Sequence, residues 1–177
     1  MKFIKDHRNF IMATGGHNDP ENRYRGVVKR YIGEKLRDCG YQVPGYEGAE
    51  SPGSPDPIRD TARTLRRVGD ELMSANREFF AEMCGALSIT PNTAYPTFKG
   101  IADEIFSTGK NWGRIVAFLA FGSSLAIHCA SRPDLGPGYV DRIVNWTATY
   151  MESNLDVWMQ DHGSWVSVIQ IIFRTFV

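Results

Sequence analysis

The chain has 177 residues, 42% of them apolar, which is enough for one domain with a buried core. Its 20 basic and 20 acidic residues cancel, so no strong net charge draws it toward nucleic acid or an anionic membrane. The three cysteines, Cys39, Cys84 and Cys129, lack metal-ligand spacing, and we expect reduced thiols in a cytosolic compartment.

The two ends of the chain carry few structural signals. Residues 1–20 are polar and contain glycine, so we expect a loosely ordered segment, and they lack the continuous apolar run of a secretory signal. No segment reaches the roughly 18 apolar residues of a membrane span, because the nearest candidate, Asn111–Cys129, is interrupted by polar side chains. The tail, residues 174–177, stops in apolar sequence, so a membrane anchor could follow it in a longer natural product.

Apolar residues at helical spacing predict the first elements. A helix is expected over Glu21–Cys39, ended by Gly40, and a flexible loop rich in proline and glycine follows over residues 43–56. The next helix starts near Asp56–Pro57, because proline suits a first helical turn. A short amphipathic segment then continues to Leu87.

The central part of the chain predicts the core helix. A turn at Thr90–Thr93 precedes a helix over Ala94–Phe106. Asn111 can cap the following helix, because its side-chain oxygen can accept free amide protons of the first turn. From Ile115 to Ala130 this helix is apolar around most of its circumference, so other helices must surround it.

The last part of the chain predicts one or two helices over Tyr139–Trp158 and a short final helix after Gly163. The sequence therefore predicts seven or eight helices and no convincing strand. The fold class is all-α, a single globular domain over residues 21–173 built around the central apolar helix.

Four motifs resemble those of one family. NWGRIVAFLAFG, which begins at Asn111, resembles the first homology motif of the Bcl family, the B-cell-lymphoma regulators of apoptosis. WMQDHGSW, Trp158–Trp165, resembles the second motif; TLRRVGDEL, Thr64–Leu72, resembles the third; VVKRYIGEKLRDCGY, Val27–Tyr41, resembles the fourth. They occur in the family's order, and the resemblance covers roughly Glu21 to Phe173. It implies the all-α Bcl-like fold.

The resemblance implies binding and not catalysis. Folded members of the family present a hydrophobic groove that receives an amphipathic helix, the third motif of a partner, a well-known example of helix-in-groove recognition. The implied partners are pro-apoptotic Bcl family proteins, both Bak- or Bax-like and motif-only, and no cofactor, metal or nucleic acid is implied. The implied location is the cytoplasm and the mitochondrial outer membrane, or the endoplasmic reticulum membrane.

The resemblance also implies a role for Arg114. In the family, the arginine of Asn-Trp-Gly-Arg lies at the groove's rim and pairs with the aspartate of the incoming helix. One guanidinium meeting one carboxylate would fix that helix's register and direction. Gly113 would let the partner approach closely, Asn111 would cap the helix, and Trp112 would pack beneath the site. The alternative is a solvated arginine in a first helical turn.

The groove lining implied by the resemblance comes from several helices. Its floor is Val116, Ala117 and Phe121, its walls are Leu72, Phe79, Phe80 and Met83 on one side and Ile101 and Ile105 on the other, and Ile172 lies at the rim. Any one of these could instead be ordinary core, because apolar helical stripes are usually buried. The chain's own death motif consists of Leu65, Val68, Gly69, Asp70 and Leu72.

Three positions depart from the family pattern. The second motif reads Gly163-Ser164-Trp165-Val166 where the family has Gly-Gly-Trp and an acidic residue, so Ser164 would have to cap the last helix. Asn76 stands where groove-lining aromatic residues are common in the family. The departures in the second motif affect how the last helix is positioned, and the one at Asn76 affects which partner helices fit the groove.

The motifs favour one function over two others. A pro-survival protein that sequesters partner helices is favoured by ITPNTAYPTF, residues 89–98, and by NWGRIVAF. The alternative is a Bak- or Bax-like effector that oligomerises and permeabilises the mitochondrial outer membrane, in which Leu125–His128 and the aspartate–glutamate pair after Gly69 also have counterparts. An enzyme is disfavoured, because His128 and Cys129 are helix neighbours that point about 100° apart.

Overall fold

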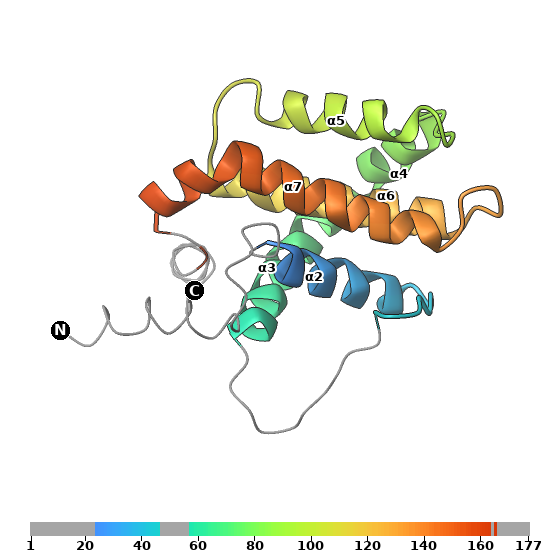
Figure 1. The fold of residues 1–177 in the computed structure, drawn as a ribbon, viewed down its shortest axis with the longest axis horizontal. Coiled ribbons are helices and arrows are strands. Elements are labelled where there is room, and N and C mark those ends of the chain that lie inside the picture. Colours follow the sequence, from blue (N-terminus) through green and yellow to red (C-terminus); the bar gives the residue numbers. More distant parts are fainter. Residues whose placement is uncertain (1–23, 47–56, 164, 166–177) are drawn as a thin grey trace.

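A computed structural model describes residues 24–46, 57–163 and 165 (Figure 1). These residues form six helices and no strand, which confirms the all-α prediction. In chain order they are α2 (Arg25–Asp38), α3 (Pro57–Ala75), α4 (Arg77–Ala86), α5 (Ala94–Ile105), α6 (Trp112–Ala130) and α7 (Gly138–Asp161). The helix expected after Gly163, the cap at Ser164 and the predictions for residues 1–20 and 174–177 lie outside the described residues.

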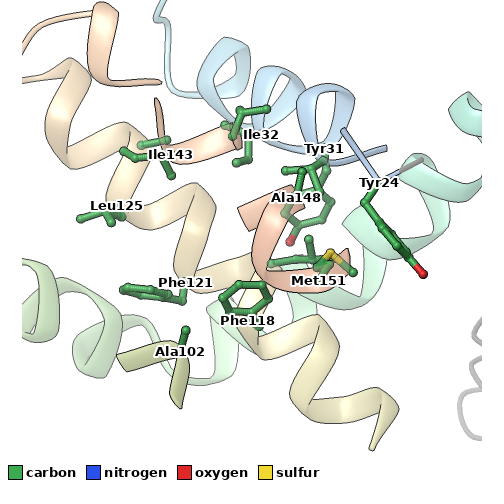
Figure 2. Close-up of a cluster of buried hydrophobic side chains, with 14 of the residues drawn as sticks. Tyr24, Tyr31, Ile32, Ala102, Phe118, Phe121, Leu125, Ile143, Ala148 and Met151 are labelled. Carbon is green, nitrogen blue, oxygen red and sulfur yellow. The ribbon is translucent and has the colours of Figure 1, made fainter. Parts of the chain in front are cut away.

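Helix α6 occupies the centre of the fold. It contacts each of the other five described helices, and Figure 1 shows it behind α7, with α5 above the pair and α2 and α3 below. Figure 2 shows how Phe118 and Phe121 of α6 meet Ala102 of α5 on one side and Met151 of α7 on the other. Burying each large apolar side chain contributes about 1.5–3 kcal/mol, so this helix organises the core.

By length and composition alone, α6 could also cross a membrane. It has 19 residues with a mean hydropathy of 1.4 in its most apolar stretch, so the prediction that no segment is sufficiently apolar was wrong by this measure. Its polar residues are too few to bring the mean hydropathy below that of a membrane-spanning helix. However, 67% of that stretch is buried inside the fold, as expected of a core helix.

The segment predicted as one or two helices is the single helix α7, Gly138–Asp161. No proline or glycine occurs between Tyr139 and Asp161, so nothing in the sequence interrupts the helix. Its buried side chains, among them Ile143 and Met151, recur at helical spacing along one face against α6 and α2.

A network of ion pairs joins α3 to α2. Arg66 lies 2.6 Å from Asp38 and 3.4 Å from Glu34, and Asp70 pairs with Lys35 and, at 3.6 Å, with Arg66. Partly exposed pairs such as these contribute little stability individually. Together they link Glu34, Lys35 and Asp38 of α2 to Arg66 and Asp70 of α3.

Candidate functional site

A groove of about 580 Å³ opens between α4, α5 and α6. Its lining residues are Phe79, Phe80, Glu82, Met83, Ala86, Leu87, Ile101, Glu104, Ile105, Ala117 and Phe121. Nine of these eleven are apolar and two are carboxylates. A concave apolar surface with a few polar groups is typical of a ligand-binding site.

The α4 wall leaves much apolar surface uncovered. Asn76 separates α3 from α4, and its side-chain amide donates to the carbonyl of Leu72 at 2.8 Å, so the chain turns there. Phe79, in the first turn of α4, is 63% exposed and packs edge-on against Phe80, with ring centroids 5.8 Å apart. An exposed aromatic ring beside an apolar groove marks a binding surface.

The α5 wall is held in place by side chains of α7. The Tyr150 hydroxyl donates to an Asp103 carboxylate oxygen at 3.0 Å, and the Tyr150 ring stacks on Phe106 with centroids 5.9 Å apart. Burial, together with Asp103, raises the pKa of Tyr150 to about 12, so the hydroxyl keeps its proton at neutral pH. These contacts fix the orientation in which Ile101 and Ile105 line the groove.

The groove's floor is one face of α6. Ala117 and Phe121 line it, and Arg114 lies on the same face because residues three and seven apart coincide on a helix. The predicted cap at the start of α6 is confirmed, since the Asn111 side-chain oxygen accepts the backbone N–H of Arg114 at 2.9 Å.

Arg114 bends back over the turn that precedes α6. Its Nη1 donates to the carbonyl oxygen of Gly109 at 2.6 Å, and its Nη2 donates to the Thr108 hydroxyl. The side chain is half-buried and belongs to the helical turn before Ala117, outside the groove's lining. Arg114 is therefore a positive charge held in place at the end of the groove, beside the turn that joins α5 to α6.

The structure brings seven of the predicted residues together in the lining: Phe79, Phe80, Met83, Ile101, Ile105, Ala117 and Phe121. Asn111, Gly113 and Arg114 are grouped at the start of α6 and do not line the groove. Trp112 is 9% exposed and packs edge-on against Trp158 at 5.3 Å, so it supports α6 from within.

Two predicted lining residues require correction, and one is untested. Val116 is absent from the lining and packs in the core, because one step along a helix turns its side chain about 100° away from Ala117. Leu72 is half-buried and packs against the core from α3 instead of lining the groove. Ile172 lies outside the described residues.

The prediction missed Glu82, Ala86, Leu87 and Glu104. Glu82 and Ala86 follow Phe79 by three and seven residues, so helical spacing alone places them on its face. Glu104 follows Ile101 by three residues in the same way. A pattern of apolar residues alone does not include the two carboxylates.

The chain's own death motif faces α2 and the core. Leu65 is 1% exposed, Val68 and Leu72 pack against the core, and Asp70 is held by Lys35 and Arg66. This motif is therefore part of the α2–α3 interface in this conformation of the chain.

His128 and Cys129 are neighbours on α6. Cys129 is 1% exposed, and His128 Nε2 is buried without a hydrogen-bond partner in the described residues. Burial, together with Arg132, lowers the pKa of His128 below its ordinary 6.5. Within residues 24–46, 57–163 and 165, no three His, Cys, Asp or Glu side chains are grouped so that they could hold a metal ion.

The lowered pKa of His128 predicts acid sensitivity. Since the unfolded chain binds this proton more readily, stability should be retained above pH 6.5 and should fall as the pH drops below it. His128→Gln should remove part of this loss. Denaturant unfolding of both proteins at neutral pH and at about pH 5 would measure the difference; parallel losses of stability would show that other groups are responsible.

Asn111→Ala should lower the free energy of unfolding by about 0.5–2 kcal/mol, because the Arg114 backbone N–H loses its capping acceptor. Urea unfolding would measure the loss. Asn92→Ala, at an exposed position in the turn before α5, is a matched control. Equal stability of Asn111→Ala and the unaltered chain would show that water replaces the cap without cost.

Comparison with known proteins agrees with this geometry. The model of the Bcl-2 family, described as apoptosis regulator proteins, matches residues 65–165. Human Bcl-2-like protein 1 is 36% identical over 115 residues, or 65% of this chain, and the match spans only 48% of that relative. Apoptosis regulator Bcl-2 of Canis lupus familiaris is 31% identical, with 90% of this chain and 84% of the relative covered.

A solved structure shows the same fold. The crystal structure of Trichoplax adhaerens trBcl-2L2 bound to trBak BH3 shares 37% identity and a TM-score of 0.75, covering 83% of this chain and 95% of that chain. The α4–α6 groove thus belongs to an all-α protein of the apoptosis-regulator class. The chain is a member of the Bcl-2 family, as the four sequence motifs predicted.

Proposed function

We propose that this chain is a pro-survival apoptosis regulator that sequesters the amphipathic death-motif helix of pro-apoptotic Bcl family proteins. The observation that carries the proposal is the apolar groove between α4, α5 and α6, with Arg114 held at its end. The solved structure of Trichoplax adhaerens trBcl-2L2, which is 37% identical to this chain, is of that protein bound to trBak BH3. This supports death-motif helices as the class of partner. The proposed mechanism is stoichiometric binding, without catalysis or a cofactor.

The charges around the groove would orient the partner helix. Apolar side chains spaced three or four residues apart would enter between Phe79, Ile105 and Phe121, and Arg114 would pair with the partner's aspartate. Glu82 and Glu104 would favour basic over acidic partner residues beside them. This pattern of charges would select both the partner and its direction.

Similarity to Bcl-2-like protein 1 and to apoptosis regulator Bcl-2 supports a role in regulating apoptosis, and we propose that sequestration takes place in the cytoplasm and at the mitochondrial outer membrane or that of the endoplasmic reticulum. A Bak- or Bax-like effector would use the same groove but would permeabilise the membrane after capturing a helix. The two functions therefore share the binding step and differ in whether the membrane is permeabilised after it.

Titration calorimetry with the Trichoplax Bak BH3 peptide, beside dye release from liposomes of mitochondrial outer-membrane composition, tests the proposal. We expect tight one-to-one binding without dye release, and no binding of a scrambled peptide of the same composition. Peptide-triggered release would instead establish an effector. Absence of binding by the folded chain would show that the groove does not take such helices.

A further inference from the structure

We infer that Thr108 is a positioning residue for the groove: its hydroxyl, with the Gly109 carbonyl, holds the Arg114 guanidinium ready to receive a partner carboxylate. The inference rests on the proposed function. It adds a residue outside the groove's lining and assigns a binding role to the turn between α5 and α6.

The place of Arg114 in α6 needs an explanation beyond helix stability. It is the third residue of the helix after the Asn111 cap, where Glu or Gln commonly reaches back to the cap's own backbone N–H. A cation at a helix N-terminus is disfavoured by the helix dipole. An arginine also has no acceptor atom, so it cannot close that reciprocal arrangement.

Arg114 instead reaches back to two acceptors in the preceding turn. One terminal nitrogen donates to the Gly109 carbonyl oxygen at 2.6 Å, and the other donates to the Thr108 hydroxyl. Two attachments at different nitrogens fix the plane of the guanidinium as well as its position. A single hydrogen bond would leave the group free to rotate.

The turn that carries the two acceptors is itself hydrogen-bonded. The Ser107 hydroxyl donates to the Glu104 carbonyl at 2.8 Å, and the Gly109 N–H donates to the Phe106 carbonyl at 3.1 Å. Gly109 has a φ of 116°, a backbone conformation that other residues rarely adopt, and this conformation sets the direction of its carbonyl. The turn is therefore built so that its two acceptors meet the guanidinium.

Holding Arg114 does not use up its donors. A guanidinium carries five N–H groups, and the two contacts to the turn leave others for an incoming carboxylate. An arginine that is already immobile loses less rotamer entropy when a partner binds. Because Glu104 and Ile105 line the groove just before this turn, the fixed charge stays in register with the apolar lining.

Thr108→Val tests the inference, since it replaces an exposed hydroxyl with a methyl group of similar size. We expect affinity for the Trichoplax Bak BH3 peptide to fall about three- to tenfold, the range for losing the pre-ordering of one long side chain. Thr108→Ser keeps the hydroxyl and should keep wild-type affinity. Thr149→Val, at an exposed threonine of α7, is the matched control and should bind like wild type.

A second peptide, with the motif's aspartate changed to asparagine, isolates the charge contact. Thr108→Val should cost much less affinity for this peptide, because Arg114 no longer meets a carboxylate. Unchanged affinity of Thr108→Val for the aspartate peptide would overturn the inference. Equal losses in Thr108→Val and Thr108→Ser, or equal losses for both peptides, would also overturn it, because the hydroxyl would then not act through Arg114.

Failure of the proposed function gives a different result. If the wild-type chain does not bind the peptide, the groove is not a site for such helices and the binding role of Thr108 is overturned with it. The NMR order parameter of the Arg114 Nε–H reports separately on the free chain. We expect a high value that falls in Thr108→Val and is restored in Thr108→Ser; a low value in wild type would show that the turn does not hold the guanidinium.

Discussion

Arg114→Ala is expected to weaken binding of the Trichoplax Bak BH3 peptide by about 2–5 kcal/mol, which is roughly 30-fold to several thousandfold. The partner's carboxylate would enter the edge of an apolar groove without a cation to meet it. Much of the loss is the penalty of leaving that carboxylate unpaired. Arg114 is only half-buried, so we expect a value in the lower part of this range.

The fold should tolerate Arg114→Ala. The Gly109 carbonyl and the Thr108 hydroxyl that lose their donor are exposed and can hydrogen-bond to water. Removing a cation from the first turn of α6 also removes an unfavourable interaction with the helix dipole, worth about 0.3–1 kcal/mol. Thermal unfolding should therefore be nearly unchanged while affinity falls.

Lys110→Ala is a suitable control for Arg114→Ala, because it removes one exposed positive charge four residues away. Its effect should be small and should diminish with added salt. Titration calorimetry of both variants at two salt concentrations would separate a specific ion pair from a general field. If the two variants lost equal affinity, Arg114 would contribute only net charge.

The fold was predictable because its largest signals are local. The apolar circumference of Ile115–Ala130 required a central helix, and the cap at Asn111 fixed where that helix begins. The spacing of apolar residues over Tyr139–Trp158 predicts helical structure, but it does not distinguish one continuous helix from two shorter ones. Membrane-like composition and core-helix composition are also alike, so only the burial of α6 within the fold distinguishes them.

The groove was predictable only in part. The resemblance to the family placed the residues of α4 and α5 on the groove correctly, but it assigned both Val116 and Ala117 to the floor, and only Ala117 lines the groove. The carboxylates of Glu82 and Glu104 were missed because only apolar residues were sought. The hold on Arg114 depends on a turn whose shape is set by Gly109, and side-chain geometry of that kind is not visible in a pattern of residue types.

Gly69→Ala is expected to lower the free energy of unfolding by about 1–3 kcal/mol, the usual cost of overpacking a core. Gly69 is the glycine of the third motif, and at this position α3 packs directly against Tyr31 of α2. A methyl group at this position would lie 2.1 Å from the hydroxyl oxygen of Tyr31 and 3.2 Å from the ring carbon that bears it. Tyr31 is fully buried, so its ring cannot move aside without disturbing the core.

A second substitution identifies the cause. Tyr31→Phe removes the atom that clashes most severely, and that hydroxyl has no hydrogen-bond partner among the described residues. Tyr31→Phe alone should therefore cost little, and the double variant should recover most of the stability lost in Gly69→Ala. Additive losses in the double-mutant cycle would show that the hydroxyl is not the obstacle.

Gly100→Ala is expected to have the opposite effect on stability from Gly69→Ala. Gly100 lies inside α5, where an added methyl group would meet no atom within 4 Å, so alanine should stabilise the helix by about 0.4–1 kcal/mol. Urea unfolding of both alanine variants would then show changes of opposite sign. The glycine of Leu-x-x-x-Gly-Asp is thus required in this chain by the close packing of α3 on α2, a requirement that is independent of any role the motif has in binding another protein.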